Sequence, residues 1–180
     1  MAAILDPKFC SQCGAPMTKR VPEGDHRPRH ACSRCGFVHY LDPKVACGSI
    51  PESDGRIVLI RRNIEPRLGT WTFPCGFMEV DETVEEAARR ETKEETGLAV
   101  ELTDPLGTFS YSDTWWGGSI VVVAFASRVV GGELCAGTDA GEARLFRTGE
   151  IPWGELAFRS SVAALRAWFS RKGIPSPPEA

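Results

Sequence analysis

Short runs of alternating apolar and polar residues fill the chain from Lys44 onward, which is the pattern of β-strands. Turn residues bound the runs, as in ESDG at 52–55, and β-branched and aromatic side chains are frequent within them. The longest run is apolar enough to be buried on both faces of a sheet. The predicted strands are KVACGSI (44–50), RIVLIRR (56–62), TWTFP (70–74), LAVEL (98–102), GTFSYS (107–112), IVVVAFASRVV (120–130) and RLF (144–146).

Two further segments have the period of an amphipathic helix. The first begins after Thr83, which forms a capping box signature with Glu86, and it ends at Gly97. The second spans 160–171 and places four apolar residues on one stripe: Val162, Leu165, Trp168 and Phe169. Strands on both sides of a central helix, with another helix at the end, predict an α/β fold in which a mixed sheet packs between helices.

Residues 1–40 differ from the remainder of the chain. They contain four of the seven cysteines and all three histidines, and they show no apolar periodicity. Such a segment cannot form a hydrophobic core of its own, so we expect a small metal-stabilised domain there. The predicted organisation is a small domain at 1–40, a larger one at 41–171 and a flexible, proline-rich tail at 172–180.

The cysteines of the first domain form two C-x2-C pairs, Cys10 with Cys13 and Cys32 with Cys35, separated by 18 residues. Four thiolates at this spacing suit tetrahedral Zn2+ and leave no position open for water, so the zinc is expected to be structural. A glycine after each pair permits the tight turn that directs backbone amides at sulfur. Four arginines between residues 20 and 34 suggest nucleic-acid contact, but Glu23 and Asp25 interrupt them, and we favour a solvated surface.

The first helix carries an unusual cluster of carboxylates. At about 100° per residue, the stripe that begins with Val84 and Ala87 leads to Glu91, Glu94 and Glu95. Negative charge in the last helical turn opposes the macrodipole, and carboxylates about 6 Å apart repel by roughly 3 kcal/mol per pair at an effective dielectric of about 20. Mg2+ or Mn2+ would resolve this conflict, because hard cations prefer clustered carboxylates and bridge to phosphate. A solvated acidic face is the alternative.

Composition adds little to these assignments. Apolar residues make up 42% of the chain, charged residues 25%, and the formal net charge is −3, which indicates neither a nucleic-acid nor a membrane partner. No apolar run is long enough to span a bilayer, and the first residues lack the pattern of a secretory signal. We therefore expect a cytoplasmic protein with reduced cysteines.

The stretch GFMEVDETVEEAARRETKEETGL at 76–98 resembles the Nudix box, G-x5-E-x7-R-E-U-x-E-E-x-G-U, where U is aliphatic. Eight positions agree: Gly76, Glu82, Arg90, Glu91, Glu94, Glu95, Gly97 and Leu98. Only Thr92, at the first U, departs, and it retains a methyl group for packing. The resemblance implies the family's α/β/α sandwich and Mg2+-dependent hydrolysis of a nucleoside diphosphate linked to another group.

The same resemblance implies roles for these residues. Glu91, Glu94 and Glu95 would bind the metals with the carbonyl of Gly76, and Arg90 and Glu82 would orient them. Nudix enzymes often add a glutamate from outside the box, and Glu142 in GEARLF occupies a comparable place, with Glu133 and Glu150 as weaker candidates. The implied mechanism is attack of a metal-activated water on one phosphorus.

A zinc ribbon before a Nudix box is similar to the branch that contains NADH pyrophosphatases and a shorter group of FAD and ADP-ribose pyrophosphatases. This chain has FSYSDTWWGGS where NADH pyrophosphatases carry SQPWPFPxS, so we favour FAD or ADP-ribose, with release of AMP. The alternatives are an NAD(H) pyrophosphatase or NAD-cap RNA hydrolase, and a non-catalytic module that binds nucleotides or nucleic acid. The branch also implies a homodimer.

Several residues outside the box are candidates for contact with the substrate. Tyr111, Trp115 and Trp116 lie in a glycine-flanked stretch before a buried strand, where a ring can stack on adenine or flavin. Core packing is the alternative for each ring. Arg62, with Arg61 beside it, is placed at the end of a strand to contact phosphate, although an ordinary edge position explains it equally well.

Overall fold

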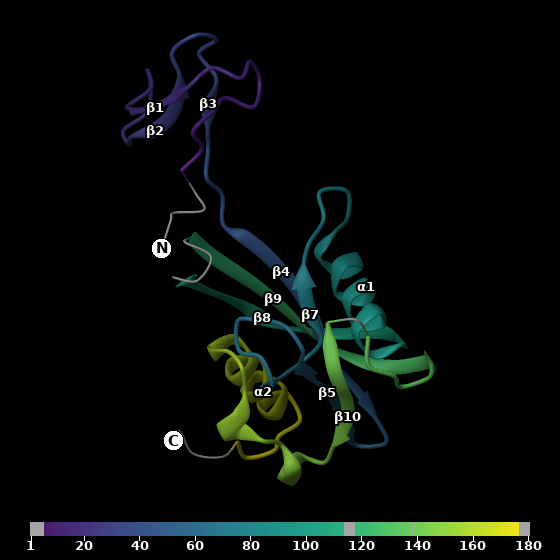
Figure 1. Ribbon diagram of the computed structural model, residues 1–180. Coiled ribbons are helices and arrows are strands. Elements are labelled where there is room, and N and C mark those ends of the chain that lie inside the picture. The colour runs from purple at the N-terminus through teal and green to yellow at the C-terminus, as the bar shows by residue number, and fades with distance from the viewer. Residues whose placement is uncertain (1–5, 114–117, 138, 177–180) are drawn as a thin grey trace. The chain divides into compact units, whose positions relative to one another are not determined.

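The computed structural model describes residues 6–113, 118–137 and 139–176 (Figure 1). The chain forms two compact units, one of Met1–Pro43 with Ser112–Ser119 and one of Lys44–Tyr111 with Ile120–Ala180.

The smaller unit contains a three-stranded antiparallel sheet in the order β1-β2-β3. The strands are β1 (Met17–Arg20), β2 (Arg29–Cys32) and β3 (Val38–His39). Strand β2 is central, and its residues Ala31 and Cys32 are fully buried. The cysteine pairs occupy the turns that precede β1 and follow β2, so the sheet and the turns together bring four sulfur atoms to one place.

The larger unit contains a mixed sheet in the order β10-β5-β4-β9-β8, with β6 paired to β5 and β7 paired to β4. Strands β4 and β9 run parallel from Lys44 opposite Ile120 to Glu52 opposite Arg128, whereas β5 and β7 are antiparallel to β4. The strands are β4 (Lys44–Ser53), β5 (Arg56–Arg62), β6 (Trp71–Thr72), β7 (Cys75–Phe77), β8 (Leu98–Asp113), β9 (Gly118–Gly132) and β10 (Ala140–Phe146).

Most predicted strands are confirmed, with two differences. LAVEL and GTFSYS belong to one 16-residue strand, β8, and the short strand β7 was not predicted. Burial along β9 is continuous only at residues 124–127, Ile120 and Val122 are also buried, and both ends of the strand are partly accessible.

Helices α1 (Val84–Thr96) and α2 (Arg159–Arg171) agree with the predicted segments. The predicted capping box is present, because Thr83 accepts from the Glu86 amide and the Glu86 side chain accepts from the Thr83 amide. Gly97 ends α1 in the left-handed conformation, at φ 71°. Hydroxyl hydrogen bonds of 2.8 Å, Thr72 with Ser161 and Tyr111 with Ser160, attach α2 to the sheet.

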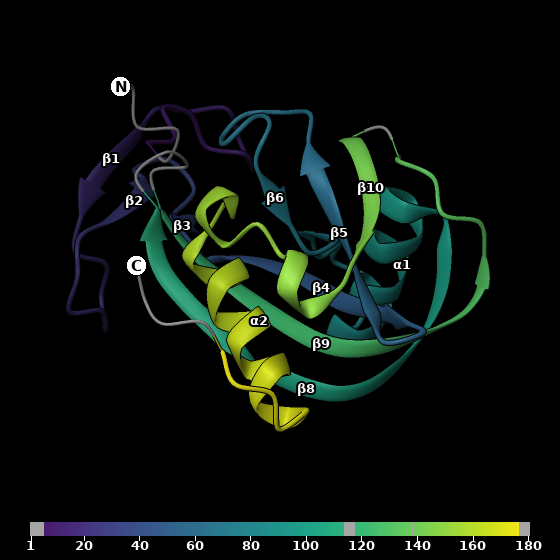
Figure 2. The ribbon, with the colours of Figure 1, turned by 90° about the horizontal axis from the view of Figure 1, so that it is seen from below.

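The two helices cover opposite faces of the sheet, which is an α/β/α sandwich (Figure 2). On α2, Leu165, Trp168 and Phe169 are buried as predicted, while Val162 is only half-buried. Two short 3-10 helices, Thr148–Glu150 and Trp153–Glu155, connect β10 to α2. Within the described ranges, no helix is long and apolar enough to cross a membrane.

Candidate active site and zinc cluster

The carboxylates of α1 lie beside its buried stripe, and the prediction that they replace this stripe is only partly right. The stripe continues through Thr92 and Thr96, which are fully buried. Glu91 and Glu95 flank it and are partly buried, whereas 59% of the Glu94 side chain is exposed. The helix therefore buries hydroxyls against the sheet and holds its carboxylates along one border of the packed face.

Thr92, the departure from the box, belongs to a chain of buried hydroxyls. Ser127 Oγ donates to Ser49 Oγ at 2.8 Å, the Ser49 and Thr92 hydroxyls lie 2.8 Å apart, and Thr92 Oγ1 donates to the carbonyl of Ala88 at 2.7 Å. The chain joins β9, β4 and α1, and every hydroxyl in it has a partner. A threonine fits here because Ser49 and Ser127 supply the polar neighbours that an aliphatic residue would leave unsatisfied.

Arg90 is the centre of the charged cluster. Its Nε and Nη2 atoms donate to the two carboxylate oxygens of Glu82 at 2.9 and 2.6 Å. Nη1 donates to Glu91 at 2.7 Å and to Glu94 at 3.0 Å, and Nη2 also donates to the carbonyl of Phe77. The hydrogen bond with Arg90 is the main reason why the pKa of Glu82 falls to about 2. One guanidinium thus fixes three carboxylates and the strand β7.

Gly76 lies directly beneath the Glu91 carboxylate. A Cβ atom at residue 76 would stand 2.3 Å from Glu91 Oε2 and 2.4 Å from its Cδ. The pairing of β7 with β4, in which Gly76 faces Cys47, brings the two residues this close. Any side chain at residue 76 would displace the carboxylate, which explains the glycine that begins the box.

Glu95 is the most deeply buried of the three helix carboxylates. Its Oε2 accepts a hydrogen bond of 2.8 Å from the backbone amide of Cys75, so the carboxylate is held against β7. Burial raises the pKa of Glu95 to about 8, and the charge of Glu91 adds to the effect. Burial also raises the pKa of the Cys75 thiol well above its usual value, so this cysteine is a poor nucleophile.

Two further charged residues interact electrostatically with Glu95. Arg62 is the last residue of β5, and Asp139 is the residue directly before β10. Burial lowers the pKa of Arg62, while the charges of Glu95 and Asp139 oppose that effect. The guanidinium donates from Nε to the carbonyl of Pro66 at 2.8 Å and lies 5.0 Å from the centre of the Phe158 ring. Arg62 is therefore a preorganised cation near the acidic cluster. Asp139 was not predicted, and its position three residues before Glu142 was the only signal in the sequence.

The predicted glutamates outside the box lie in three different settings. Glu142 is on β10, opposite Arg61 of β5, and is partly buried. Glu133 is exposed. Glu150 is exposed and accepts from the Arg147 amide at 3.0 Å, a contact that lowers its pKa. Of the three, Glu142 is on the strand next to Arg62, and it stays the candidate for an acidic group from outside the box.

The aromatic candidates are only partly covered by the structure. Tyr111 is half-buried, and its hydroxyl lies 2.8 Å from Ser160 Oγ of α2. Trp115 and Trp116 lie outside the described residues. The predicted stacking of these rings on a base stays a prediction.

The carboxylate oxygens of this cluster are of the ligand type that hard divalent cations prefer. The glutamate oxygens are not as closely gathered as the cysteine sulfurs. In the described part of the chain, only the cysteines form a group of three or more His, Cys, Asp or Glu ligand atoms within 4.8 Å of one another. Arg90 accounts for this spacing, since its Nη1 lies between Glu91 and Glu94.

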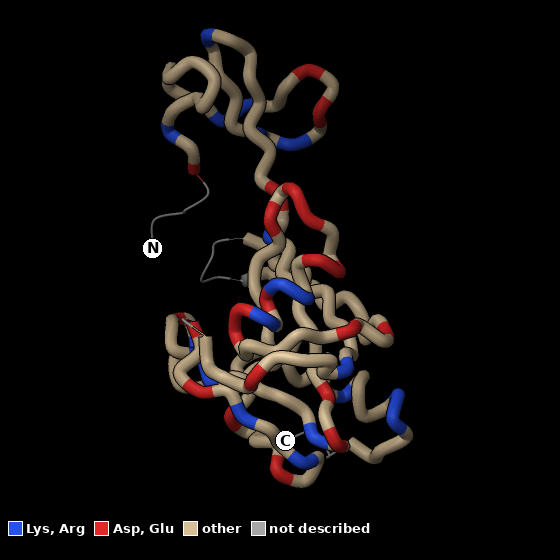
Figure 3. The backbone as a smooth tube through the Cα atoms, turned by 90° about the vertical axis from the view of Figure 1, so that its right-hand side faces the viewer, with Lys and Arg blue, Asp and Glu red and all other residues tan. Residues whose placement is uncertain are grey.

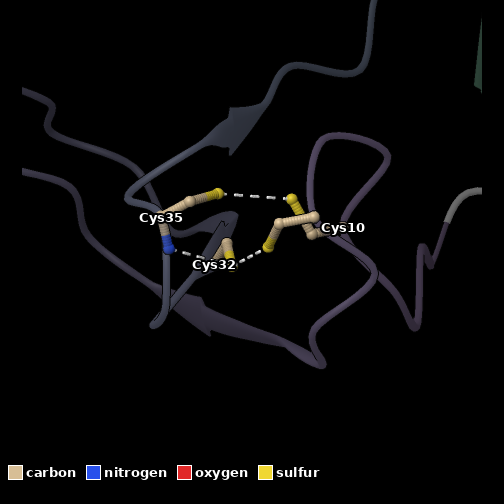
Figure 4. A group of neighbouring side chains, drawn as sticks. Cys10, Cys32 and Cys35 are labelled. Carbon is tan, nitrogen blue, oxygen red and sulfur yellow. Dashed lines mark hydrogen bonds between the residues drawn. The ribbon is translucent and has the colours of Figure 1, made fainter.

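The four sulfur atoms of the small unit converge on one point, as Figure 4 shows for the labelled residues. Cys10 Sγ lies 3.6 Å from Cys35 Sγ, and Cys13 Sγ lies 3.5 Å from Cys32 Sγ. Ligands at a Zn–S distance of about 2.3 Å in a tetrahedron are about 3.8 Å apart, so the cluster fits zinc. The Cys35 amide points at Cys32 Sγ, and this contact lowers the pKa of Cys32 to about 6.

Comparisons with known proteins agree with this geometry. Residues 42–169 match the family model described as the NUDIX domain, and residues 8–41 match a zinc ribbon described as Nudix N-terminal. The ADP-ribose pyrophosphatase of Methanocaldococcus jannaschii is 45% identical over 119 residues, which are 66% of this chain and 69% of that protein. A crystal structure of a NUDIX hydrolase from Nitrosomonas europaea aligns with a TM-score of 0.84 and 38% identity, over 94% of this chain and 96% of that one.

A second group of relatives is longer. The NAD-capped RNA hydrolase NudC of Vibrio atlanticus is 30% identical over 128 residues, and the match covers 71% of this chain but 44% of that protein. The chain thus spans less than half the length of this relative. The prediction of an enzyme is confirmed, and so are the predicted fold and family resemblance. The chain belongs to the Nudix hydrolase family and carries that family's N-terminal zinc ribbon.

Proposed function

We propose that this chain hydrolyses the pyrophosphate bond of a nucleoside diphosphate linked to a second group, with ADP-ribose as the foremost substrate and AMP as one product. The carboxylate cluster on α1 carries the proposal: Arg90 holds Glu91 and Glu94 along the helix, and the Cys75 amide holds Glu95. We favour ADP-ribose over FAD because the 45% identical relative from M. jannaschii is named an ADP-ribose pyrophosphatase.

In this proposal Glu91, Glu94, Glu95 and the carbonyl oxygen of Gly76 hold Mg2+ or Mn2+. When bound, such cations polarise phosphoryl oxygens and neutralise their charge. The remaining work falls to the chain itself. Arg90 orients the carboxylates through its contacts with Glu91 and Glu94, and the nearness of Gly76 to the Glu91 carboxylate supports a role for its carbonyl.

We further propose that Glu142 is the acidic residue that acts from outside the box and that Arg62 contacts a substrate phosphate. The support is that the charge of Arg62, on β5, interacts with that of Glu95, and that Glu142 lies on the neighbouring strand β10. Glu142→Gln should lower kcat and leave KM nearly unchanged, whereas Arg62→Gln should mainly raise KM. The matched control is Glu133→Gln, which removes an exposed carboxylate. Equal effects of Glu142→Gln and Glu133→Gln would exclude the assignment.

Tyr111, Trp115 and Trp116 are the candidates for stacking on the base of the substrate. Loss of a stacked ring costs about 1 to 3 kcal/mol per base, which corresponds to a rise in KM of about 5- to 150-fold. Replacing each residue with alanine in turn and measuring KM with ADP-ribose tests the three independently. Unchanged KM values for all three variants would remove them from the site.

The test of the proposed function is product analysis by HPLC after incubation with Mg2+ and, separately, ADP-ribose, FAD, NADH or NAD-capped RNA. AMP and ribose 5-phosphate from ADP-ribose are the expected products. Glu95→Gln should abolish their formation, and Glu85→Gln, which removes an exposed carboxylate from the same helix, should not. Absence of turnover with both Mg2+ and Mn2+ would overturn the proposal and favour a binding module.

NAD-type substrates are the second candidate, because NudC from V. atlanticus is named an NAD-capped RNA hydrolase. That relative matches this chain over only 44% of its own length, so the likeness leaves more than half of the longer protein without a counterpart. Preferential cleavage of NADH or of NAD-capped RNA in the HPLC comparison would replace ADP-ribose as the assigned substrate.

We also propose that the chain forms a homodimer, as the zinc-ribbon branch implies, and that its domains extend over 1–40 and 41–171. Light scattering at micromolar concentration tests the first proposal, and a monomer mass would refute it. Limited proteolysis tests the second. Stable fragments that end far from residue 40 would move the boundary.

A further inference from the structure

The last turn of α1 carries two carboxylates of the cluster, Glu94 and Glu95, at the end of the helix where backbone carbonyls lack partners within the helix. Negative side chains in this turn also oppose the helix macrodipole. The order of the turn therefore depends on donors from outside the helix. Acidic and basic residues are mixed along the chain (Figure 3), so charge alone does not distinguish this turn.

The connection between β9 and β10 supplies two such donors. The amide of Cys135 donates to the carbonyl of Thr96 at 3.0 Å, and the amide of Gly137 donates to the carbonyl of Glu95 at 3.1 Å. Both amides bring partial positive charge to the C-terminal end of the helix, which offsets the acidic side chains. Glu95 is thus held twice, through its backbone by Gly137 and through its side chain by the Cys75 amide.

Glycines make this close approach possible. A Cβ atom at Gly137 would stand 1.9 Å from the carbonyl oxygen of Glu94 and 3.0 Å from Cα of Glu95. Both are backbone atoms, so no side-chain rotation can relieve the contact. A second contact nearby has the same form, since a Cβ at Gly132 would stand 2.3 Å from the carbonyl oxygen of Gly97. The connection and the helix end therefore pack backbone to backbone.

The other side of the connection is attached to the sheet. The carbonyl of Gly137 accepts from the amide of Ala140, the first residue of β10, at 3.2 Å. The carbonyl of Asp139 accepts from the amide of Asn63 at 3.1 Å, and Asn63 directly follows Arg62 at the end of β5. The connection therefore joins the last turn of α1 to the ends of two strands, and it cannot move freely when the helix contact changes.

We propose that Gly137 is a positioning residue for the carboxylates of Glu94 and Glu95. A side chain at residue 137 must either displace the last turn of α1 or lift the connection from it, and lifting breaks the hydrogen bonds of the Cys135 and Gly137 amides. Both changes displace the two carboxylates. The consequence for metal binding rests on the proposed function, in which these carboxylates hold a divalent cation.

The test compares Gly137→Ala with Gly131→Ala in the full zinc-loaded chain. Gly131 is the matched control, because it is exposed, lies near the end of β9, and a Cβ there meets no atom within 4 Å. The first readout needs no catalytic metal: it is the NMR signal of the Cys75 amide, which reports the hydrogen bond to Glu95. In Gly137→Ala this signal should move upfield, and the amide should exchange with solvent at least about tenfold faster. Gly131→Ala should change neither.

The second readout is the affinity for Mn2+, measured by titration calorimetry. Gly137→Ala should weaken it about 10- to 100-fold, as the loss of groups that hold metal ligands does, and Gly131→Ala should leave it unchanged. An unchanged Cys75 amide in Gly137→Ala, or equal effects of the two variants, would overturn the proposal. If the Cys75 amide moves while Mn2+ affinity stays the same, or while the unmodified chain binds no Mn2+, the positioning stands and the metal role of Glu94 and Glu95 falls.

Hydrogen exchange in the unmodified chain tests the same inference without relying on a variant that folds. If Gly137 holds Glu95 in place, an opening that frees the Gly137 amide must also free the Cys75 amide. Relative to its rate in an unfolded peptide, the Cys75 amide should therefore exchange at least as fast as the Gly137 amide. A Cys75 amide that exchanges more than about tenfold more slowly than that of Gly137 would overturn the proposal.

Discussion

Replacement of Gly76 by alanine would separate the catalytic geometry of this chain from its stability. The added Cβ would lie 2.3 Å from Glu91 Oε2, whereas ordinary contact begins at 3.4 Å, so the carboxylate must move by about 1 Å. Glu91 is a flexible side chain, and it can make this movement by turning away from β7. The backbone of β7 and its pairing with β4 need not change.

The two consequences differ in size. A 1 Å misplacement of a catalytic group costs about 100-fold in rate, which corresponds to about 2.7 kcal/mol of transition-state stabilisation. The loss of stability is limited to the hydrogen bond between Arg90 Nη1 and Glu91. Such a bond to a charged group contributes about 1.5 to 3 kcal/mol at most, and it contributes less here because both side chains are partly exposed. We therefore expect Gly76→Ala to fold and to hydrolyse ADP-ribose about 100-fold more slowly.

The assay measures kcat/KM with ADP-ribose as a function of Mg2+ concentration, and urea unfolding measures stability. The control is Gly149→Ala, since a Cβ there meets no atom within 4 Å and no positive φ is involved. That variant should keep full activity and unfold at the same or slightly higher urea concentration. Activity of Gly76→Ala within a factor of about three of the unmodified chain would refute the reasoning, because Glu91 would then not depend on the space above residue 76.

Three further predictions concern the buried hydroxyls, the buried carboxylate and the zinc. Thr92→Val removes a hydrogen-bond partner of Ser49 and should lower the free energy of unfolding, measured with urea, by about 1 to 3 kcal/mol. The control Thr103→Val changes an exposed residue and should not lower it. Equal unfolding midpoints of the two variants would contradict the role of the buried hydroxyls. Burial raises the pKa of Glu95 to about 8, so the folded chain binds a proton that the unfolded chain releases near 4.5, and without divalent cations stability should fall as pH rises between these values. Glu95→Gln should lose this slope, and an identical slope would disprove the assignment. Removal of zinc should raise hydrogen exchange in 8–41 and leave Val84–Thr96 protected, while uniform loosening of both would indicate one cooperative unit.

Local signals in the sequence were sufficient to predict where α1 begins and ends. The capping box at Thr83 and Glu86 and the left-handed Gly97 act within a few residues of the helix ends, so they can be recognised without tertiary structure. The roles expected of Arg90 and Glu82 came from the resemblance to the Nudix box. Spacing alone would not have identified Arg90 as the donor to Glu82, Glu91 and Glu94.

Strand β8 shows where a local signal misleads. Pro105 and Gly107 indicate a break between two strands, yet the strand continues through both. β8 is the last strand in the sheet order, and a proline on an edge strand sacrifices no ladder hydrogen bond when its nitrogen faces away from the neighbour. Strand β7 shows the opposite failure. Three residues, Cys75–Phe77, are too short for a recognisable pattern, and pairing with β4 makes them a strand.

The contacts of the buried hydroxyls and the position of Asp139 near Glu95 could not be predicted from the sequence either. Ser49, Thr92 and Ser127 are separated by tens of residues, and only the parallel pairing of β4 with β9 and the packing of α1 bring them together. A polar residue within an apolar run lowers the expectation of a buried strand unless its hydrogen-bond partner is known. The same holds for Asp139, whose effect on the pKa of Glu95 depends on where β10 begins.

The distribution of charge on α1 links the fold to the proposed chemistry. Arg90 satisfies Glu82, Glu91 and Glu94, and the cost of their repulsion is reduced accordingly. Glu95 receives only a backbone amide at 2.8 Å among the described hydrogen-bond donors, and burial keeps its pKa near 8. The carboxylate that receives no hydrogen bond from Arg90 is thus the one held by the backbone of β7. A helix selected for stability alone would place an apolar residue there, whereas a hydrolase that binds a divalent cation requires an oxygen ligand that is fixed in advance and is not engaged in a hydrogen-bonded ion pair.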